Sequence, residues 1–199
     1  TTLINLLMRF YDVDGGSILV DGVDTKEMTR HELRDRFGMV LQDAWLFEGS
    51  IRDNIAYAQD NLPEEKIIAA ARSASVDSFI KTLPGGYDFE LSTGAENISQ
   101  GQRQLLTIAR AMASDPEIMI LDEATSNVDT HTEQLIQKAL AKLMHGRTSF
   151  VIAHRLSTIR DADMILYMEH GDILEHGSHE ELMAQHGKYE ALYMSQFAQ

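Results

Sequence analysis

The chain has 199 residues, a formal net charge of -14 and no cysteine. This length suffices for one domain with a buried hydrophobic core. The acidic excess argues against nucleic acid as a partner, because duplex-binding proteins carry a basic surface. It permits a small anion such as a nucleotide, which a few backbone N–H groups and a metal ion can hold locally. The lack of cysteine excludes disulfides and cysteine-based metal sites.

The amino terminus carries no signal peptide, and no run of about 20 apolar residues could span a membrane. An apolar helical pattern begins at once, at Leu3, Leu6, Leu7 and Phe10. A domain rarely opens in the middle of a helix. We therefore interpret the amino terminus as a truncation.

In the first hundred residues, periodicity and turn signals predict helices over 1–10, 29–36, 50–57 and 63–73 and strands over 17–20 and 38–42. Thr29 is the expected cap of the second helix, with Glu32 completing a capping box. Pro63 suits the start of a helix.

In the second half, the pattern predicts helices over 100–113, 130–144, 178–185 and from 188 onward, and strands over 118–122, 149–153, 164–168 and 172–174. Gly146 is expected to mark the end of the helix 130–144. The last two strands are expected to be joined across 169–171 as a hairpin, and Ser178 to cap the next helix with Glu181 in the box position. Strands that alternate with helices predict an α/β fold with a mostly parallel sheet flanked by helices. The segment from about 53 to 115 is expected to be a helical subdomain inserted between two core strands.

The strongest chemical signal is the acid pair Asp122-Glu123, which follows the apolar run 118–121. The carboxyl ends of parallel strands are where open α/β sheets bind ligands. Two adjacent acids are costly there unless a cation or a reacting water uses them. Asp122 suits Mg²⁺ and Glu123 suits positioning the attacking water of a phosphoryl transfer. The alternative is that both acids cap the following loop and helix.

Three further sites carry polar groups at the ends of elements. Ser99 and Gly101 open the amphipathic helix 100–113, where free N–H groups favour a phosphate. The alternative is helix capping by Ser99, with Gly101 as a flexible joint. His154 follows a core strand and could stabilise γ-phosphate charge, or be a hydrogen-bonded structural residue. Gln42 could reach a metal ion or water, or be a turn residue.

These motifs occur in one order, and together they resemble the nucleotide-binding domain of ABC transporters, in particular the exporter branch. Gln42 resembles the Q-loop residue and Glu123 the catalytic glutamate, while His154 resembles the H-loop histidine. The remaining matches are Thr1-Thr2 with the end of Walker A, 98–102 with the signature motif, 118–122 with the Walker B strand and 126–129 with the D-loop. The resemblance covers essentially residues 1–199.

The resemblance implies a P-loop NTPase-like fold that binds ATP and Mg²⁺ and hydrolyses ATP to power export. It implies catalysis by Glu123 and His154. The residues implied to bind Mg²⁺ are Thr1, Gln42 and Asp122, and those implied to bind ATP are Thr1, Thr2, Gln42, Ser99, Gly101, Gln102 and Asp129.

Members of the family pair head to tail and enclose two ATP molecules, so the resemblance implies a second nucleotide-binding domain as partner. It also implies a transmembrane domain whose coupling helices contact the surface near Gln42, Trp45, Leu46 and Phe47, and a location on the cytoplasmic face of the cell membrane. The alternative for Trp45, Leu46 and Phe47 is packing of the insert against the core.

The sequence departs from the family pattern in three places. The glycines and lysine of Walker A are absent, so the chain alone is expected to bind ATP weakly or not at all and not to turn over. Gln100 replaces the first glycine of the signature, and its side chain should obstruct approach to the γ-phosphate. Thr93 stands where exporters often carry an acidic residue.

A complete Walker B with Glu123, beside a signature altered at Gln100, indicates one half of a heterodimeric exporter. Glu123 would serve a competent site, and Gln100 would contribute to a degenerate one. Two other classes are open, a soluble non-transport ABC ATPase and an inert or regulatory module. The acidic net charge argues against a soluble non-transport ATPase. Whether the chain is an inert or regulatory module depends on the sequence upstream of Thr1.

Overall fold

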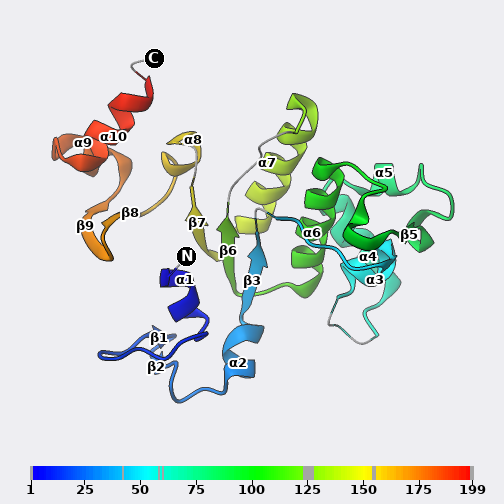
Figure 1. Cartoon of the computed structure of the whole chain (residues 1–199), viewed down its shortest axis with the longest axis horizontal. Helices are drawn as coiled ribbons and strands as arrows, with labels where there is room; N and C mark the ends of the chain where they lie inside the picture. The colour runs from blue at the N-terminus through cyan, green and yellow to red at the C-terminus, as the bar shows by residue number, and fades with distance from the viewer. Residues whose placement is uncertain are drawn as a thin grey trace. The chain divides into compact units, whose positions relative to one another are not determined.

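The computed structural model describes residues 2–41, 43–57, 59, 61–122, 128–153 and 156–197, without the side chains of 156, 157, 196 and 197. The chain forms two compact units, residues 1–150 and 151–199, and each is described by itself (Figure 1). Across the described ranges, no helix has the length and hydrophobicity that crossing a membrane requires.

The central sheet of the first unit has the strand order β3 (Phe37–Val40), β6 (Ile118–Asp122), β7 (Thr148–Ile152). Strands β3 and β6 are parallel, with Phe37 opposite Ile118 and Val40 opposite Leu121. This confirms the predicted α/β fold. The sequence predicts that β7 is buried, but its residues are only half-buried or exposed. Among the described residues, β7 is the last strand in the order and pairs with β6 alone.

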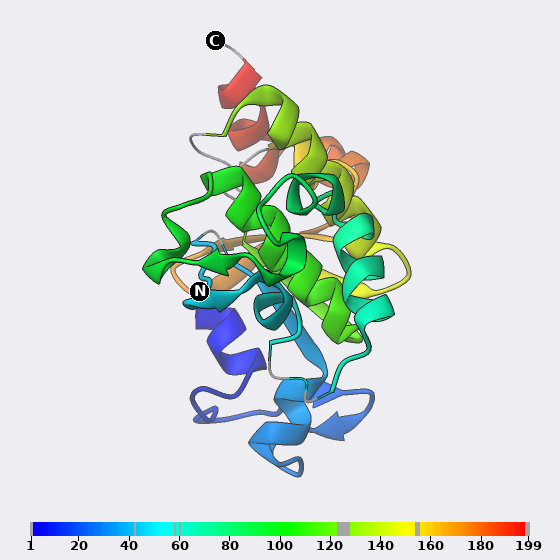
Figure 2. The ribbon, with the colours of Figure 1, turned by 90° about the vertical axis from the view of Figure 1, so that its right-hand side faces the viewer.

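Two long helices pack on this sheet unit, α6 (Gln100–Ser114) and α7 (Thr130–Met144), as Figures 1 and 2 show. Both confirm the predicted ranges. Their buried faces include Leu105, Ile108, Ala109, Ile136, Ala139 and Leu143. A left-handed Gly146 follows the end of α7, as predicted.

The first turns of α6 and α7 approach closely at Gly101. A Cβ atom at this position would lie 2.4 Å from Cγ2 of Thr132 and 3.0 Å from Cγ1 of Val128. Real Cβ atoms do not come so near to other side chains, so only glycine fits here without a shift. Gly101 is therefore a packing glycine inside a helix and not a flexible joint.

The chain between β3 and β6 is mainly helical. Its elements are β4 (Gly49–Ser50), α3 (Ile51–Ile55), α4 (Glu64–Ser73), α5 (Asp77–Ile80), η1 (Gly86–Asp88), β5 (Glu90–Leu91), η2 (Thr93–Ala95) and α6. The predicted helices near 50–57 and 63–73 are confirmed by α3 and α4. The antiparallel pair β4–β5 was not predicted, because two-residue strands carry no periodicity. The insert boundaries near 53 and 115 stay a prediction.

The Asn54 side chain of α3 is fully buried and holds the segment before the helix. Its Oδ1 accepts hydrogen bonds from the Phe47 N–H at 3.1 Å and from Nη2 of Arg110 at 3.0 Å. Its Nδ2 donates to the carbonyl oxygens of Phe47 and Ser50, each at 3.0 Å. One amide thus satisfies backbone groups that would otherwise be buried without partners.

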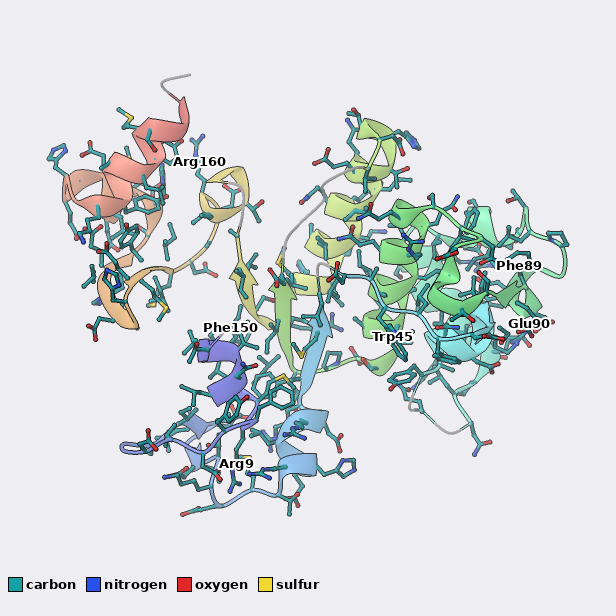
Figure 3. The ribbon with its side chains drawn as sticks, in the orientation of Figure 1. Arg9, Trp45, Phe89, Glu90, Phe150 and Arg160 are labelled. Carbon is teal, nitrogen blue, oxygen red and sulfur yellow. The ribbon has the colours of Figure 1, made fainter. Side chains whose placement is uncertain are left out.

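The amino-terminal part contains α1 (Thr2–Leu7), β1 (Leu19–Val20), β2 (Val23–Asp24) and α2 (Arg30–Asp35). The predicted capping box of Thr29 and Glu32 is present. Arg9, labelled in Figure 3, donates to the carbonyl oxygens of Thr25 and Met28 at 2.9 Å each. These bonds tie the end of the α1 region to the loop that precedes α2.

The second unit contains α8 (Leu156–Ile159), the antiparallel hairpin β8 (Ile165–Glu169) and β9 (Asp172–Gly177), α9 (His179–Ala184) and α10 (Lys188–Phe197). The predicted hairpin and the capping box of Ser178 and Glu181 are confirmed. Glu175 accepts from the backbone N–H groups of Lys188 at 2.6 Å and Tyr189 at 2.9 Å, so a strand carboxylate caps the start of α10.

We predict that Asn54→Ala lowers the free energy of unfolding by about 3 kcal/mol, because it leaves buried backbone groups and Arg110 without a partner. Urea denaturation measures the change. Asn97→Ala is the matched control. Asn97 is exposed and also bonds to backbone groups, those of Ser92 and Glu90, but water can replace its bonds. Equal losses in the two variants would contradict the prediction.

We also predict that Gly101→Ala destabilises the chain by about 1–3 kcal/mol, because the added methyl group overpacks the α6–α7 contact. Thermal and urea unfolding measure this. Gly15→Ala serves as the control, since a Cβ atom there meets nothing within 4 Å. A Gly101→Ala variant as stable as Gly15→Ala would show that the two helices can separate at no cost.

Candidate nucleotide site

Asp122 is the last residue of β6 and is partly exposed. It follows Met119, Ile120 and Leu121, which are 0–3% exposed. The buried strand thus places the carboxylate of Asp122 at the edge of the sheet, as the sequence predicts. Carboxylate oxygens are the ligands that Mg²⁺ prefers, so the residue type and its place fit a metal ligand.

The parallel strand β3 ends at the same edge, since Val40 lies opposite Leu121. Gln42 follows β3 and Glu123 follows Asp122, so the chain leaves both strands at one edge of the sheet. Residues 1, 42, 123–127, 154 and 155 lie outside the described residues. The predicted roles of Thr1, Gln42, Glu123 and His154 therefore stay predictions.

Ser99 is the N-cap of α6 and forms a capping box with Gln102. Its Oγ accepts from the Gln102 N–H at 3.3 Å, and Oε1 of Gln102 accepts from the Ser99 N–H at 2.9 Å. The capping interpretation of Ser99 is thus correct. It does not conflict with anion binding, because a helix start keeps further N–H groups directed outward.

Gln100 and Gly101 differ sharply in their surroundings. Gln100 is the first residue of α6 and is partly exposed, whereas Gly101 is buried against Val128 and Thr132. A side chain at position 100 therefore fits the fold, and a side chain at position 101 does not. The Gln100 side chain can therefore obstruct a molecule that approaches the start of α6 from solvent, but not the packing of α6 within the fold.

Asp129 is the N-cap of α7, and its Oδ1 accepts from the Thr132 N–H at 3.0 Å. Hydrogen bonds from Thr132 hold the pKa of the Asp129 carboxyl below its usual range. Asp129 thus caps α7. Thr2 lies exposed in the first turn of α1.

The segment after β3 presents an aromatic surface of Trp45, Phe47 and Tyr57. The Trp45 ring lies 6.2 Å from that of Phe47 and 6.1 Å from that of Tyr57. Trp45 is 59% exposed and lies at the side of the helix group in Figure 3, whereas Leu46 is 2% exposed and belongs to the core. The packing alternative therefore holds for Leu46 and not for Trp45.

Two residues of this region, Glu48 and Arg110, could not be identified from the sequence. Oγ1 of Thr93 donates to Oε2 of Glu48 at 2.5 Å, so a carboxylate lies beside position 93 although the residue itself is neutral. Arg110 binds the segment 45–54 from the third turn of α6. No local pattern could reveal either contact, because 45 or more residues separate the partners.

The profile of the ABC transporter family matches residues 1–126 of the chain. The fatty acid ABC transporter ATP-binding/permease protein of Mycobacterium tuberculosis is 56% identical over 189 residues, which cover 95% of this chain and 30% of that protein. The ATP-dependent lipid A-core flippase of Desulfotalea psychrophila is 50% identical over 98% of this chain and 34% of its own length. The chain thus spans about a third of these relatives.

A solved structure of a bacterial Atm1-family ABC exporter with ATP bound superposes with a TM-score of 0.89 at 42% sequence identity. The match covers 98% of this chain and 34% of that one. The parallel β3–β6 sheet with Asp122 at its edge agrees with these likenesses. The chain therefore belongs to the ABC transporter family and is a nucleotide-binding domain of the exporter type.

Proposed function

We propose that the chain, as the nucleotide-binding domain of a full-length exporter, binds and hydrolyses ATP and so powers export of a substrate across a membrane. The observation that carries the proposal is Asp122 at the edge of a parallel sheet in a chain of this family. The relatives support it, since they are named as ATP-binding/permease proteins and flippases. The chain's own substrate depends on parts that lie outside it.

In the proposed site, Asp122 holds Mg²⁺ with Gln42 and the hydroxyl of Thr1, and Thr1 and Thr2 contact the phosphates. A bound Mg²⁺ supplies neutralisation of phosphate charge. Glu123 positions and deprotonates the attacking water, and His154 stabilises the charge on the γ-phosphate. The buried strand β6 supports the role of Asp122, because a rigid element holds its terminal side chain in place.

A second surface of the chain is proposed to complete the ATP site of a partner domain. Ser99, Gly101 and Gln102 start α6, and Asp129 starts α7. The contact of Gly101 with Thr132 ties these two helix starts together. They would therefore meet the partner's nucleotide as one body, with backbone N–H groups of α6 toward the phosphate.

The partner is proposed to be a different half-transporter. Gln100 is partly exposed at the start of α6, where its side chain meets whatever approaches the helix. Loss of one backbone hydrogen-bond donor to the transition state lowers a rate by on the order of 10² to 10³. Glu123 would then serve a competent site with the partner's signature, and Gln100 would slow the other.

The aromatic surface of Trp45, Phe47 and Tyr57 is proposed to receive a coupling helix of a transmembrane domain. The exposed Trp45 ring supports this, since a large exposed aromatic side chain beside a rigid core is typical of a contact surface. The domain would then lie on the cytoplasmic face of the cell membrane.

We predict that Glu123→Gln in the full-length transporter lowers ATP turnover by at least about 10²-fold while ATP binding persists, because the amide cannot accept the proton of water. Steady-state hydrolysis and nucleotide binding measure the two effects. Glu117→Gln, the same change at the exposed opposite end of β6, is expected to act like the wild type. Full turnover in Glu123→Gln would refute the role of Glu123.

We also predict that Gln100→Gly and Gln100→Ala change steady-state ATP turnover by less than about twofold, because the Glu123 site uses the signature of the partner. The measurement requires the transporter isolated with its natural partner. A rise of about 10-fold or more would instead show that Gln100 faces a competent site, as in a homodimer, and would exclude the heterodimer proposal.

A further inference from the structure

Arg110 lies in the third turn of α6 and binds the segment 45–54, which carries part of the aromatic surface. Its Nε donates to the Asn54 carbonyl at 2.8 Å, Nη2 to Oδ1 of Asn54 at 3.0 Å and Nη1 to the Trp45 carbonyl at 3.1 Å. The guanidinium also lies over the rings of Tyr57, at 4.8 Å, and Trp45, at 5.9 Å.

The planar guanidinium fixes these contacts in one geometry, because its N–H groups diverge in a rigid fork. The side chain of Arg110 is partly buried, and this burial lowers its pKa. Its partners in these contacts are carbonyl oxygens and ring faces. A charge held in this way resists separation from its acceptors, since each lost bond leaves a desolvated donor.

The same helix begins at the surface proposed to meet the partner's nucleotide. Ten residues separate Gln100 from Arg110, which corresponds to about 15 Å along an α-helix. Helix α6 is continuous over this distance, and its first turn is fixed against α7 at Gly101. Any shift of the helix start is therefore carried as a rigid displacement to Arg110.

We propose that Arg110 is a positioning residue that couples the first turn of α6 to Trp45, so that nucleotide contact at one end moves the aromatic surface at the other. The proposal rests on the proposed function and names the residue that connects its two surfaces.

The test uses the full-length transporter in lipid nanodiscs, with a single Ala44→Cys labelled by bimane next to Trp45. The chain has no cysteine of its own, and any cysteines elsewhere in the transporter are replaced. Bimane emission is recorded before and after Mg-ATP with orthovanadate. ATP hydrolysis and its KM are measured on the same samples.

We expect Arg110→Lys to reduce the ATP-dependent change in emission by about twofold or more with an unchanged KM for ATP, because a lysine keeps the charge but cannot bridge the acceptors. Arg110→Met removes the buried charge altogether and gives the same loss if the lysine variant does not fold. Arg52→Lys is the control, since Arg52 pairs with Glu64 and Asp88 and not with the segment 45–50.

An undiminished emission change in Arg110→Lys overturns the inference, as does a loss that is matched by a higher KM. The transporter without the Ala44→Cys change, treated with bimane in the same way, gives the background emission. If the labelled Ala44→Cys transporter with Arg110 intact hydrolyses ATP with no change in emission, the inference is also overturned. A wild type that neither binds nor hydrolyses ATP refutes the proposed function instead, so the two failures are distinguishable.

Discussion

The parallel pairing of β3 with β6 is the constraint on which the rest of the first unit depends. It requires a glycine at position 38, where a Cβ atom would lie 2.4 Å from Cγ of Pro116 and 2.8 Å from Sδ of Met119. The register then places Val40 beside Leu121, so that both strands release the chain at one edge. The carboxyl ends of the two strands owe their proximity to this register.

Helix α6 joins the sheet to the helical segment, because it contacts β3, α3, α4 and α7. Its apolar face is buried in the core, while two of its arginines, one near its start and one in its third turn, bond to other segments. Loop carbonyls of Ala95 and Ile98 accept from Arg103, and those of Trp45 and Asn54 accept from Arg110. One helix therefore holds two loops, one through Arg103 near its start and one through Arg110 in its third turn.

Sequence reasoning recovered what has a period or a short spacing. The helices α6 and α7 and the capping boxes at Thr29 and Ser178 depend on residues three or four apart, and the strand β6 on a continuous apolar run. The contacts of Arg110, Glu48 and Gly101 depend on the tertiary fold, which brings distant residues together. The residues Glu123 and His154 were singled out by their place after predicted strands and then matched by resemblance, and their geometry lies outside the described ranges.

The contrast between Gln100 and Gly101 bears on how such a domain can change over time. Position 101 is closed to any larger residue by Thr132 and Val128, whereas position 100 accepts a side chain without cost to the fold. A lineage can therefore lose the first glycine of this pair through a single tolerated substitution and keep a stable protein. Sequence divergence between duplicated halves of a transporter would therefore begin at position 100, where the fold does not require a glycine.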